Sequence, residues 1–500
     1  MPDLPMMAVG DLLPDHPDRD NPGLLRAENV LPRVGHYQPI RGLVPNIDPL
    51  DGRCRGAEPV YAYDGSVMNF AGDNTKLYEL ESGAYADKSG ATYDMQDKYF
   101  WTFFGYNGNG FAVGGYHTLQ EYGATFDDVV TSGSATGDPA PQALYADVVR
   151  EFIVTGNQLS NPQEVVWSAL GDQSTWVAQG GDASVANQAG RQILQQGGPI
   201  TQVVGGEFGT IFCESSIYRM NYQGAPIVFS FDNVEPDRGT IAPGSVAQFG
   251  HMIAYLDFDG WYLYDGAQSR PIGSTKINES FLEDFDQEYP KSIDSMIDVE
   301  GTTIFWSYVS VSAPIVGVCD KLIAYNWATD KFSGPIHMTT EALVYSLTPA
   351  TMSDDEPFAS TLSDDASVAD IWSDAQEFKG GGRPVMAAFD ENHQHAVTEG
   401  PNLEALIETG EYSLSPGKFT LVNGIRPVVD GNDPNISISI GRRDQTHGAV
   451  NYTAEVSPSP RTGISNFRSS SRFQRVQMRV SGDFEKIVGF EADVVSTGRR

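Results

Sequence analysis

The sequence has few cysteines and no long apolar run. Only three of its 500 residues are cysteines, and Cys54, Cys213 and Cys319 lie far apart. An odd number at wide spacing argues against a disulfide framework and suits a reducing assembly compartment. Cys213 lies within an apolar strand pattern, so we expect it to be buried and unreactive. No stretch approaches the ~18 consecutive apolar residues of a membrane helix, and the N-terminus lacks a signal-peptide pattern, so we expect neither a membrane span nor a secretory leader.

Basic residues are also scarce. The chain has 32 Lys and Arg against 66 Asp and Glu, a net charge of −34. Such a field repels nucleic acid and membrane surfaces, which excludes tight binding to DNA phosphates through counterion release. Two interpretations remain open: the charge keeps a large protein soluble, or it lines a channel through which DNA slides without sticking.

Long windows with helical periodicity are nearly absent. The sequence is instead rich in aromatic residues and in turn formers, with 52 Gly and 30 Pro. A hydrophobic content of 40% in 500 residues is enough for a substantial core divided among two or three domains. The composition therefore predicts an all-β protein.

The clearest strand pattern lies between Gly205 and Gly273. In its second half, Asp259-Gly260 separates the apolar runs 253–256 and 261–264. Asp-Gly between two such runs predicts a β-hairpin, because this pair readily adopts the positive φ of a type I′ turn. In its first half, Ser215-Ser216 marks a second hairpin within residues 210–220.

Similar hairpin units recur along the chain from Val60. Glycines near the start of the inner hairpins mark the repeat, at intervals of 41 to 53 residues: Gly65, Gly110, Gly156, Gly209, Gly250 and Gly301. Four short strands in each unit of this length are typical of β-propeller blades, although WD40 and kelch signatures are missing. The repeat predicts a β-propeller, and an array of β-sandwiches is the alternative.

Composition divides the chain into three parts. Residues 1–55, rich in Pro, Asp and Gly, are expected to form an extended N-terminal arm laid over the body or a neighbouring subunit. Residues 56–400 are expected to form the propeller. Within them, the acidic stretch 352–380 reads as a solvated loop, while 367–372 and 384–389 could supply strands of the last blade.

Residues 401–500 are expected to form a separate C-terminal β domain resembling a sandwich. Its strand patterns are separated by turns such as Asp430-Gly431. Residues 441–500 carry 10 Lys and Arg against 6 Asp and Glu, whereas residues 1–440 carry a net charge of −38. A basic cluster is therefore a candidate contact with an acidic protein partner: Arg468, Arg472, Arg475, Arg479, Arg499 and Arg500. Base stacking on the interleaved Phe467 and Phe473 is the alternative. The alternation of Arg475, Gln477 and Arg479 with apolar residues predicts one exposed strand face.

Catalytic and metal-binding signatures are missing from the sequence. It contains neither a phosphate-binding G-x-x-x-x-G-K-[ST] loop nor a G-x-S-x-G nucleophile elbow. Asp257 and Asp259 resemble the start of a calcium loop, but Gln268 stands where the loop needs Glu, so a hairpin turn explains them better. His393 and His395 have metal-ligand spacing without further ligands nearby, which favours a surface loop. We therefore expect no enzyme activity, no cofactor and no metal.

The densest acidic cluster consists of Glu283, Asp284, Asp286 and Glu288. We expect it to form a solvated loop or to face a channel lumen. The alternative is a pair of carboxylates for glycoside hydrolysis, with Glu283 and Asp286 as candidates, because sequence alone does not give the distance between acids.

Several stretches, in order along most of the chain, resemble the nozzle protein of short-tailed bacteriophages, also called the packaged-DNA stabilisation or tail accessory protein. They are ENVLPRVGHYQPIRGL, FAGDNTKLYELESG, WTFFGYNGNGFAVGG, VVWSALGDQSTWV, ESSIYRMNYQG, FDNVEPDRGTIAPGSV, LDFDGWYLYDGAQSRPIG and LEALIETGEYSL.

This resemblance implies a propeller-bearing virion subunit. Such subunits form a homo-oligomeric ring, typically a hexamer, below the portal and adaptor rings of the tail. The ring extends and closes the DNA exit channel, retains the packaged genome and docks fibres or spikes, while double-stranded DNA passes without sequence-specific binding. The implied location is the virion tail, assembled in the host cytoplasm, and no catalytic residue is carried over.

Three other functions remain open. The chain could be a propeller that binds glycans through exposed aromatic residues, a glycoside hydrolase, or a stopper or hub protein of a long-tailed phage.

Overall fold

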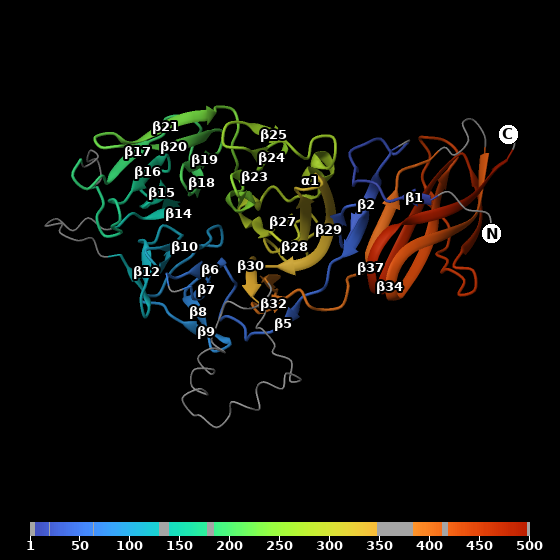
Figure 1. The fold of residues 1–500 in the computed structure, drawn as a ribbon, viewed down its shortest axis with the longest axis horizontal. Coiled ribbons are helices and arrows are strands. Elements are labelled where there is room, and N and C mark those ends of the chain that lie inside the picture. Colours follow the sequence, from blue (N-terminus) through green and yellow to red (C-terminus); the bar gives the residue numbers. More distant parts are fainter. Residues whose placement is uncertain are drawn as a thin grey trace, which may run out of the picture.

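The computed structural model describes residues 6–19, 21–63, 65–129, 140–177, 185–347, 384–412 and 419–497. The chain forms a β-propeller beside a curled sheet that contains the C-terminal strands (Figure 1). Nearly all its regular structure is β, as the composition predicts. The described residues contain one α-helix, α1 (Asn278–Asp284), and two short 3₁₀ helices, η1 (Pro243–Ser245) and η2 (Pro290–Ser292).

The described residues form seven four-stranded antiparallel units in the propeller, and six of them are sheets of their own. The first blade contains β6 (Ala57–Tyr61), β7 (Val67–Gly72), β8 (Leu77–Glu81) and β9 (Ala84–Asp87). The second contains β10 (Thr102–Tyr106), β11 (Asn109–Val113), β12 (Gln120–Tyr122) and β13 (Phe126–Asp128). The third contains β14 (Ala143–Val149), β15 (Phe152–Gln158), β16 (Glu164–Trp167) and β17 (Gly190–Ile193).

The remaining blades continue the pattern. The fourth contains β18 (Ile200–Val204), β19 (Gly209–Cys213), β20 (Ile217–Gly224) and β21 (Val228–Glu235). The fifth contains β22 (Ala247–Phe249), β23 (Met252–Asp257), β24 (Gly260–Tyr264) and β25 (Ser269–Pro271). The sixth contains β26 (Asp294–Asp298), β27 (Thr303–Tyr308), β28 (Cys319–Asn326) and β29 (Lys331–Thr340), and it is continuous with the C-terminal sheet.

The seventh blade closes the ring with strands from both ends of the propeller sequence. It contains β30 (Ala342–Leu347), β31 (Pro384–Phe389), β32 (His395–Val397) and the early strand β5 (Val44–Pro45). β5 pairs with β32, so the N-terminal segment supplies the outermost strand of the last blade. The expected strand at 384–389 is confirmed as β31, whereas the whole acidic stretch 352–380, with residues 367–372, lies outside the described residues.

The marker glycines confirm the blade repeat. Each of the six lies in the hairpin that joins the first and second strands of one of the first six blades, either in the turn or at the start or interior of the second strand. In the second blade, Asn107 and Gly108 form a two-residue turn with φ of 50° and 81°. Positive φ at both positions is the type I′ geometry that matches the twist of the strands.

The Asp259-Gly260 hairpin is present, but its turn differs from the expected one. Asp257 pairs with Gly260, so Phe258 and Asp259 are the two turn residues. Neither has a positive φ, whereas Gly260, the first residue of β24, has a φ of 133°. The glycine is needed where the chain enters β24, beside the Asn278 side chain.

Two strands of 25 residues, β34 (Phe419–Arg443) and β37 (Phe473–Thr497), dominate the C-terminal sheet. They pair with each other along their whole lengths. The shorter strands of this sheet from the C-terminal region are β33 (Ala405–Thr409), β35 (Asn451–Tyr452) and β36 (Ser465–Ser471).

The expected turn at Asp430-Gly431 is wrong. Strand β34 continues through these two residues without a turn. Its register against β37 shifts between Asp430 and Gly431 and again between Gly431 and Asp433. Register shifts of this kind are β-bulges, which bend a strand and increase its twist. The glycine therefore marks a bend in one long strand, and bends of this kind let the paired strands curl (Figure 1).

The N-terminal arm lies on the C-terminal sheet of the same chain. Apart from β5, which belongs to the seventh blade, its strands are β1 (Met6–Ala8), β2 (Leu24–Glu28), β3 (Val30–Arg33) and β4 (His36–Pro39). β1 and β4 pair with β37, and β2 lies between β29 of the sixth blade and β33. The propeller is thus joined to the C-terminal sheet by continuous strand pairing.

One hydrophobic core spans the junction between the two parts. It contains Trp261 and Trp306 from the fifth and sixth blades, Ala27 from β2, and Ile438 and Phe490 from the two long strands. All three cysteines are buried and free, as expected for Cys213. In the described parts of the chain, no helix is long and apolar enough to cross a membrane.

Candidate functional site: the central cavity of the propeller

The innermost strands of the seven blades surround a cavity of about 760 Å³. Strands β6, β10, β14, β18, β22, β26 and β30 all contribute to its wall, together with the connections that precede several of them. A cavity of this size is in the range that holds small ligands. The cavity is therefore a candidate ligand site.

Two aspartates of the cavity wall hold neighbouring blades together. The Asp147 carboxylate in β14 accepts hydrogen bonds from the backbone N–H groups of Val148 and Gly205, both at 2.7 Å, and Gly205 follows β18 of the next blade. Asp294 in β26 likewise accepts a hydrogen bond at 2.6 Å from the backbone N–H of Leu343 in β30. Burial raises the pKa of Asp147, and it raises the pKa of Asp294 to about 6. Both aspartates have a structural role between blades.

Glu58 on β6 is different, because it makes no hydrogen bond or ion pair with any described residue. Its side chain is open to the water of the cavity but enclosed by the surrounding blades. The pKa of Glu58 is raised to about 8, mainly by burial and to a smaller extent by the negative charges of Asp147 and Asp294. Most Glu58 side chains are therefore protonated at pH 7 and could donate a hydrogen bond to a ligand.

The described residues contain no cluster of three or more His, Cys, Asp or Glu side chains that could hold a metal ion. Asp257 and Asp259 instead form ion pairs with Arg238, at 3.1 and 3.0 Å. His393 Nδ1 lies 2.9 Å from Glu341, and the Nδ1 of His395 lies 2.7 Å from the side-chain oxygen of Asn46. His395 is buried, so the surface-loop interpretation is wrong for this residue.

The predicted acidic cluster lies on α1 and the loop after it, away from the central cavity. Glu283 and Glu288 are exposed. Asp284 pairs with Lys321 at 2.7 Å and accepts a hydrogen bond from the hydroxyl of Tyr308 at 2.8 Å. Asp286 accepts a hydrogen bond at 3.0 Å from the backbone N–H of Glu288. Asp284 thus anchors α1 to the sixth blade, while Asp286 orders the loop.

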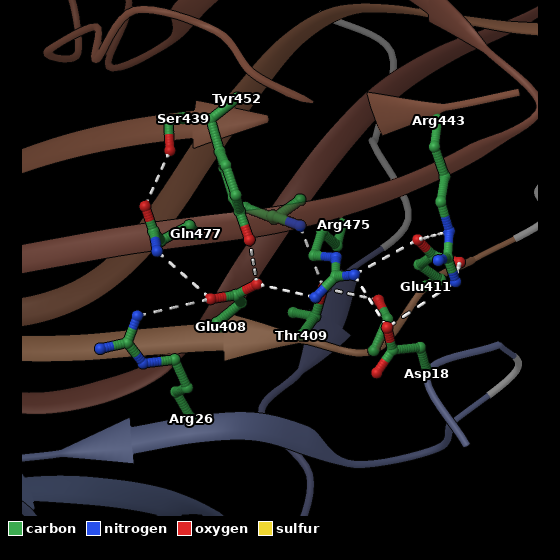
Figure 2. A network of polar contacts seen from close by, with 12 residues as sticks. Asp18, Arg26, Glu408, Thr409, Glu411, Ser439, Arg443, Tyr452, Arg475 and Gln477 are labelled. Atoms are coloured by element: carbon green, nitrogen blue, oxygen red, sulfur yellow. Dashed lines mark hydrogen bonds and ion pairs between the residues drawn. The ribbon is translucent and has the colours of Figure 1, made fainter. Parts of the chain in front are cut away.

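The predicted basic cluster is split between the surface and the interior. Arg475 lies in a buried network (Figure 2), where its guanidinium approaches Asp18 at 3.0 Å, Glu408 at 3.1 Å and Glu411 at 3.4 Å. Arg443 joins the network from β34, with Nε 2.6 Å from Glu411. Since Asp18 comes from the N-terminal arm, the network connects the arm to β33, β34 and β37.

The expectation of an exposed basic face is therefore wrong for Arg475, which is only 8% exposed. The alternation does place Arg475 and Gln477 on one face of β37, but that face meets Glu408 of β33 and the hydroxyl of Tyr452. Arg475 therefore pairs with carboxylates of its own chain and not with those of another protein.

The other predicted arginines lie nearer the surface. Arg479 is half-buried and pairs with Glu404 at 2.9 Å and Glu455 at 3.1 Å. Arg472 is exposed, with its guanidinium 5.4 Å from the centre of the Phe419 ring, and Arg468 is exposed on β36. Arg499 and Arg500 lie outside the described residues.

Sequence reasoning missed the residues of the central cavity. Glu58, Lys98 and Lys291 stand alone in the sequence, without a motif around them. One signal could have found them: each lies at the start of a blade's first strand or just before it, where propeller residues reach the axis.

Comparisons with known proteins give fold likeness only. No family model and no curated protein matches the sequence. Among solved structures, the extracellular domain of a one-component system from Bacteroides thetaiotaomicron is 7% identical with a TM-score of 0.41, covering 86% of this chain and 48% of that one. This chain thus spans about half of that protein's length. A protein from Bacteroides uniformis named as a 6-phosphogluconolactonase is 12% identical with a TM-score of 0.31, covering 56% of this chain and 86% of that one.

Proposed function

We propose that the chain is a structural subunit of a ring in the tail of a short-tailed bacteriophage, a nozzle that extends and closes the DNA exit channel below the portal and adaptor. In this role the protein is not an enzyme. Its task is to hold a fixed shape between neighbouring subunits and to present surfaces to adaptor and fibre or spike proteins.

The observation that carries the proposal is the strand-paired junction between the propeller and the C-terminal sheet. Strand β2 of the arm pairs with β29 of the sixth blade on one side and with β33 on the other. A common hydrophobic core and the Arg475 network reinforce this junction. A two-part body without a flexible linker is what a subunit needs in order to keep its place in a ring under the pressure of packaged DNA.

The stretches that resemble nozzle proteins belong to the elements that build this body. They include the arm strands β3 and β4, the turns of several blades and strand β33. Resemblance spread over both parts and the junction supports a likeness of the whole subunit.

The charge supports the same role. A chain with a net charge of −34 repels DNA phosphates, so a channel built from several copies would let DNA pass without holding it. The symmetry of the ring determines which surface of each subunit faces such a channel.

The test is the symmetry of the assembled protein. Electron microscopy of the purified chain, alone and mixed with its adaptor ring, is expected to show closed rings of six copies, and antibody labelling is expected to mark the tails of virions. A chain that stays monomeric with the adaptor and is missing from purified virions would contradict the proposal.

The central cavity favours one second candidate, a glycan-binding propeller, because its size suits a small ligand. A glycan array with the purified chain tests it. Glycan binding by a chain that never assembles would favour this candidate over the ring. The hydrolase version with Glu283 and Asp286 has less support, since neither residue lines the central cavity.

A further inference from the structure

Two lysines and a tyrosine meet at the central cavity from opposite parts of the propeller. Lys98 and Tyr99 belong to the connection between β9 and β10, and Lys291 belongs to η2, just before β26. All three line the cavity. In the ring, β6 and β30 separate β10 from β26 on one side, and β14, β18 and β22 separate them on the other. The two connections therefore reach toward each other across the end of the cavity where the inner strands begin.

Both ammonium groups lie close to the same aromatic ring. The Nζ atom of Lys98 is 4.9 Å from the centre of the Tyr99 ring, and that of Lys291 is 5.7 Å from it. Two positive charges gathered around one side chain repel each other, and a bound anion would offset this repulsion.

Neither lysine has an acidic partner among the described residues, which is unusual in this chain. Of the eight described lysines, five pair with a carboxylate: Lys76, Lys88, Lys276, Lys321 and Lys331. In a protein with 66 acidic side chains, the lack of a partner for both Lys98 and Lys291 leaves a pair of cations available to a ligand.

The electrostatics of the site fit an anionic ligand. Burial lowers the pKa of Lys291, and the neighbouring charge of Lys98 lowers it further, while Glu214 acts weakly in the opposite direction. A bound anion would offset both effects. Three acids line the same cavity. Glu58 is mostly protonated at pH 7, so it opposes an anion less than a carboxylate would. Asp294 is mostly ionised at pH 7, and its carboxylate and that of Asp147 accept hydrogen bonds from backbone N–H groups.

We propose that Lys98 and Lys291, gathered around Tyr99 at one end of the central cavity, bind the oxyanion group of a small ligand, either a carboxylate or a phosphate. The cavity behind them holds the rest of the ligand, and its volume of about 760 Å³ is ample for an acidic monosaccharide. This site is a property of one propeller, so it stands or falls independently of the proposed ring.

Isothermal titration calorimetry on the full chain tests the proposal. Sodium glucuronate and inorganic phosphate are the two probes, each titrated at constant ionic strength with sodium chloride as the reference. Saturable binding of at least one probe is expected, and the stronger of the two identifies the ligand as a carboxylate or a phosphate. Binding of neither probe up to 20-fold above about 1 mM, the weak end of ordinary ligand affinities, would overturn the proposal.

Variants locate the site. Lys98→Gln and Lys291→Gln are each expected to lower the affinity for the bound probe at least tenfold. Lys291→Arg, which keeps the charge, is expected to retain most of the affinity. Lys486→Gln is the matched control, because Lys486 is exposed on the distant β37 and also lacks an acidic partner among the described residues. Lys98 is exposed, so its variant is expected to fold even if Lys291→Gln does not.

Equal binding by wild type and Lys98→Gln would overturn the assignment. So would an equal loss of binding in Lys486→Gln, because that result would mean nonspecific attraction to positive charge. Thermal unfolding of each variant shows whether a loss of binding reflects the site or the fold.

Discussion

Arg475 compensates buried negative charge. Its guanidinium lies within 3.5 Å of Glu408 and Glu411, and both of these carboxylates are almost fully buried. Removing one member of a buried ion network leaves the remaining charges unpaired, which typically costs about 3–5 kcal/mol. We therefore expect Arg475→Gln to lower the free energy of unfolding by about that amount, measured by urea denaturation.

Arg479 provides the comparison for this prediction. It lies two residues away on β37 and also has two acidic neighbours, Glu404 and Glu455, but its side chain is 40% exposed. Exposed ion pairs contribute about 0–1 kcal/mol, so Arg479→Gln is expected to have little effect. Equal losses for the two variants would mean that burial of the network does not determine its contribution.

His395 makes the closure of the propeller sensitive to acid. It is 3% exposed on β32, next to the closing strand β5, and burial lowers its pKa to about 4. The folded state resists protonation of His395, whereas the unfolded state binds a proton near pH 6.5. The contribution of neutral His395 to the free energy of unfolding is therefore fully present above pH 6.5 and is lost as the pH falls toward 4. The difference corresponds to about 3 kcal/mol.

The measurement compares melting temperatures from pH 7 to pH 4 for wild type and His395→Gln. The melting temperature of the variant is expected to decrease less than that of wild type, because the variant lacks the histidine. Some decrease remains, because other acidic groups titrate in both proteins. His251→Gln, at an exposed turn, is expected to follow wild type. Parallel curves for wild type and His395→Gln would rule out the histidine as the source of the acid sensitivity.

At the scale of elements, the pairing of β34 with β37 depends on glycines inside the strands. Gly482 has a φ of 81°, and a Cβ atom there would lie 2.5 Å from the backbone oxygen of Asp433. Gly482→Ala therefore combines an unfavourable backbone conformation with a steric clash, and we expect a loss of about 2 kcal/mol or more in a urea unfolding experiment.

Gly463 separates these two causes. Its φ is 67°, but an added Cβ atom would meet nothing within 4 Å. Gly463→Ala is expected to lose about 1 kcal/mol from the backbone term alone. If Gly463→Ala costs as much as Gly482→Ala, close packing between the two long strands is not what requires the glycine.

Glycines also show how far the sequence predicts the fold. In the propeller, the strands are short, so Asn107-Gly108 and the marker glycines coincide with hairpins, and the blade repeat could be read directly. In the C-terminal sheet, Asp430-Gly431 has the same local chemistry but lies inside a 25-residue strand. A glycine that permits a turn also permits a bulge, and only the partner strand decides between them.

The candidate site could not be predicted for a related reason. Glu58, Lys98 and Lys291 are far apart in the sequence and come together only because three blades meet at one axis. The alternation around Arg475 correctly gave the strand face, but alternation does not say what covers that face. The partners of Arg475 include Asp18, which lies more than 450 residues away in the arm.

At the scale of the whole molecule, a single strand of the arm completes the structure. Strand β2 lies between the propeller and the C-terminal sheet, and its residue Ala27 pairs with both Gly334 and Ile407. Because this pairing and the common core make the two parts one cooperative unit, we expect differential scanning calorimetry of the wild type to show one unfolding transition.

Ala27→Pro tests this coupling. Ala27 is fully buried, and proline in a central strand removes a backbone donor and introduces a ring where two strands pack closely. We expect the single transition to split into two, one for the propeller and one for the C-terminal sheet, with the lower one shifted down by several degrees. Ala84→Pro, on the exposed edge strand β9, is expected to keep a single transition. Two transitions in the wild type, or a single one in Ala27→Pro, would show that β2 does not unite the two parts, and a ring subunit would then need another source of rigidity.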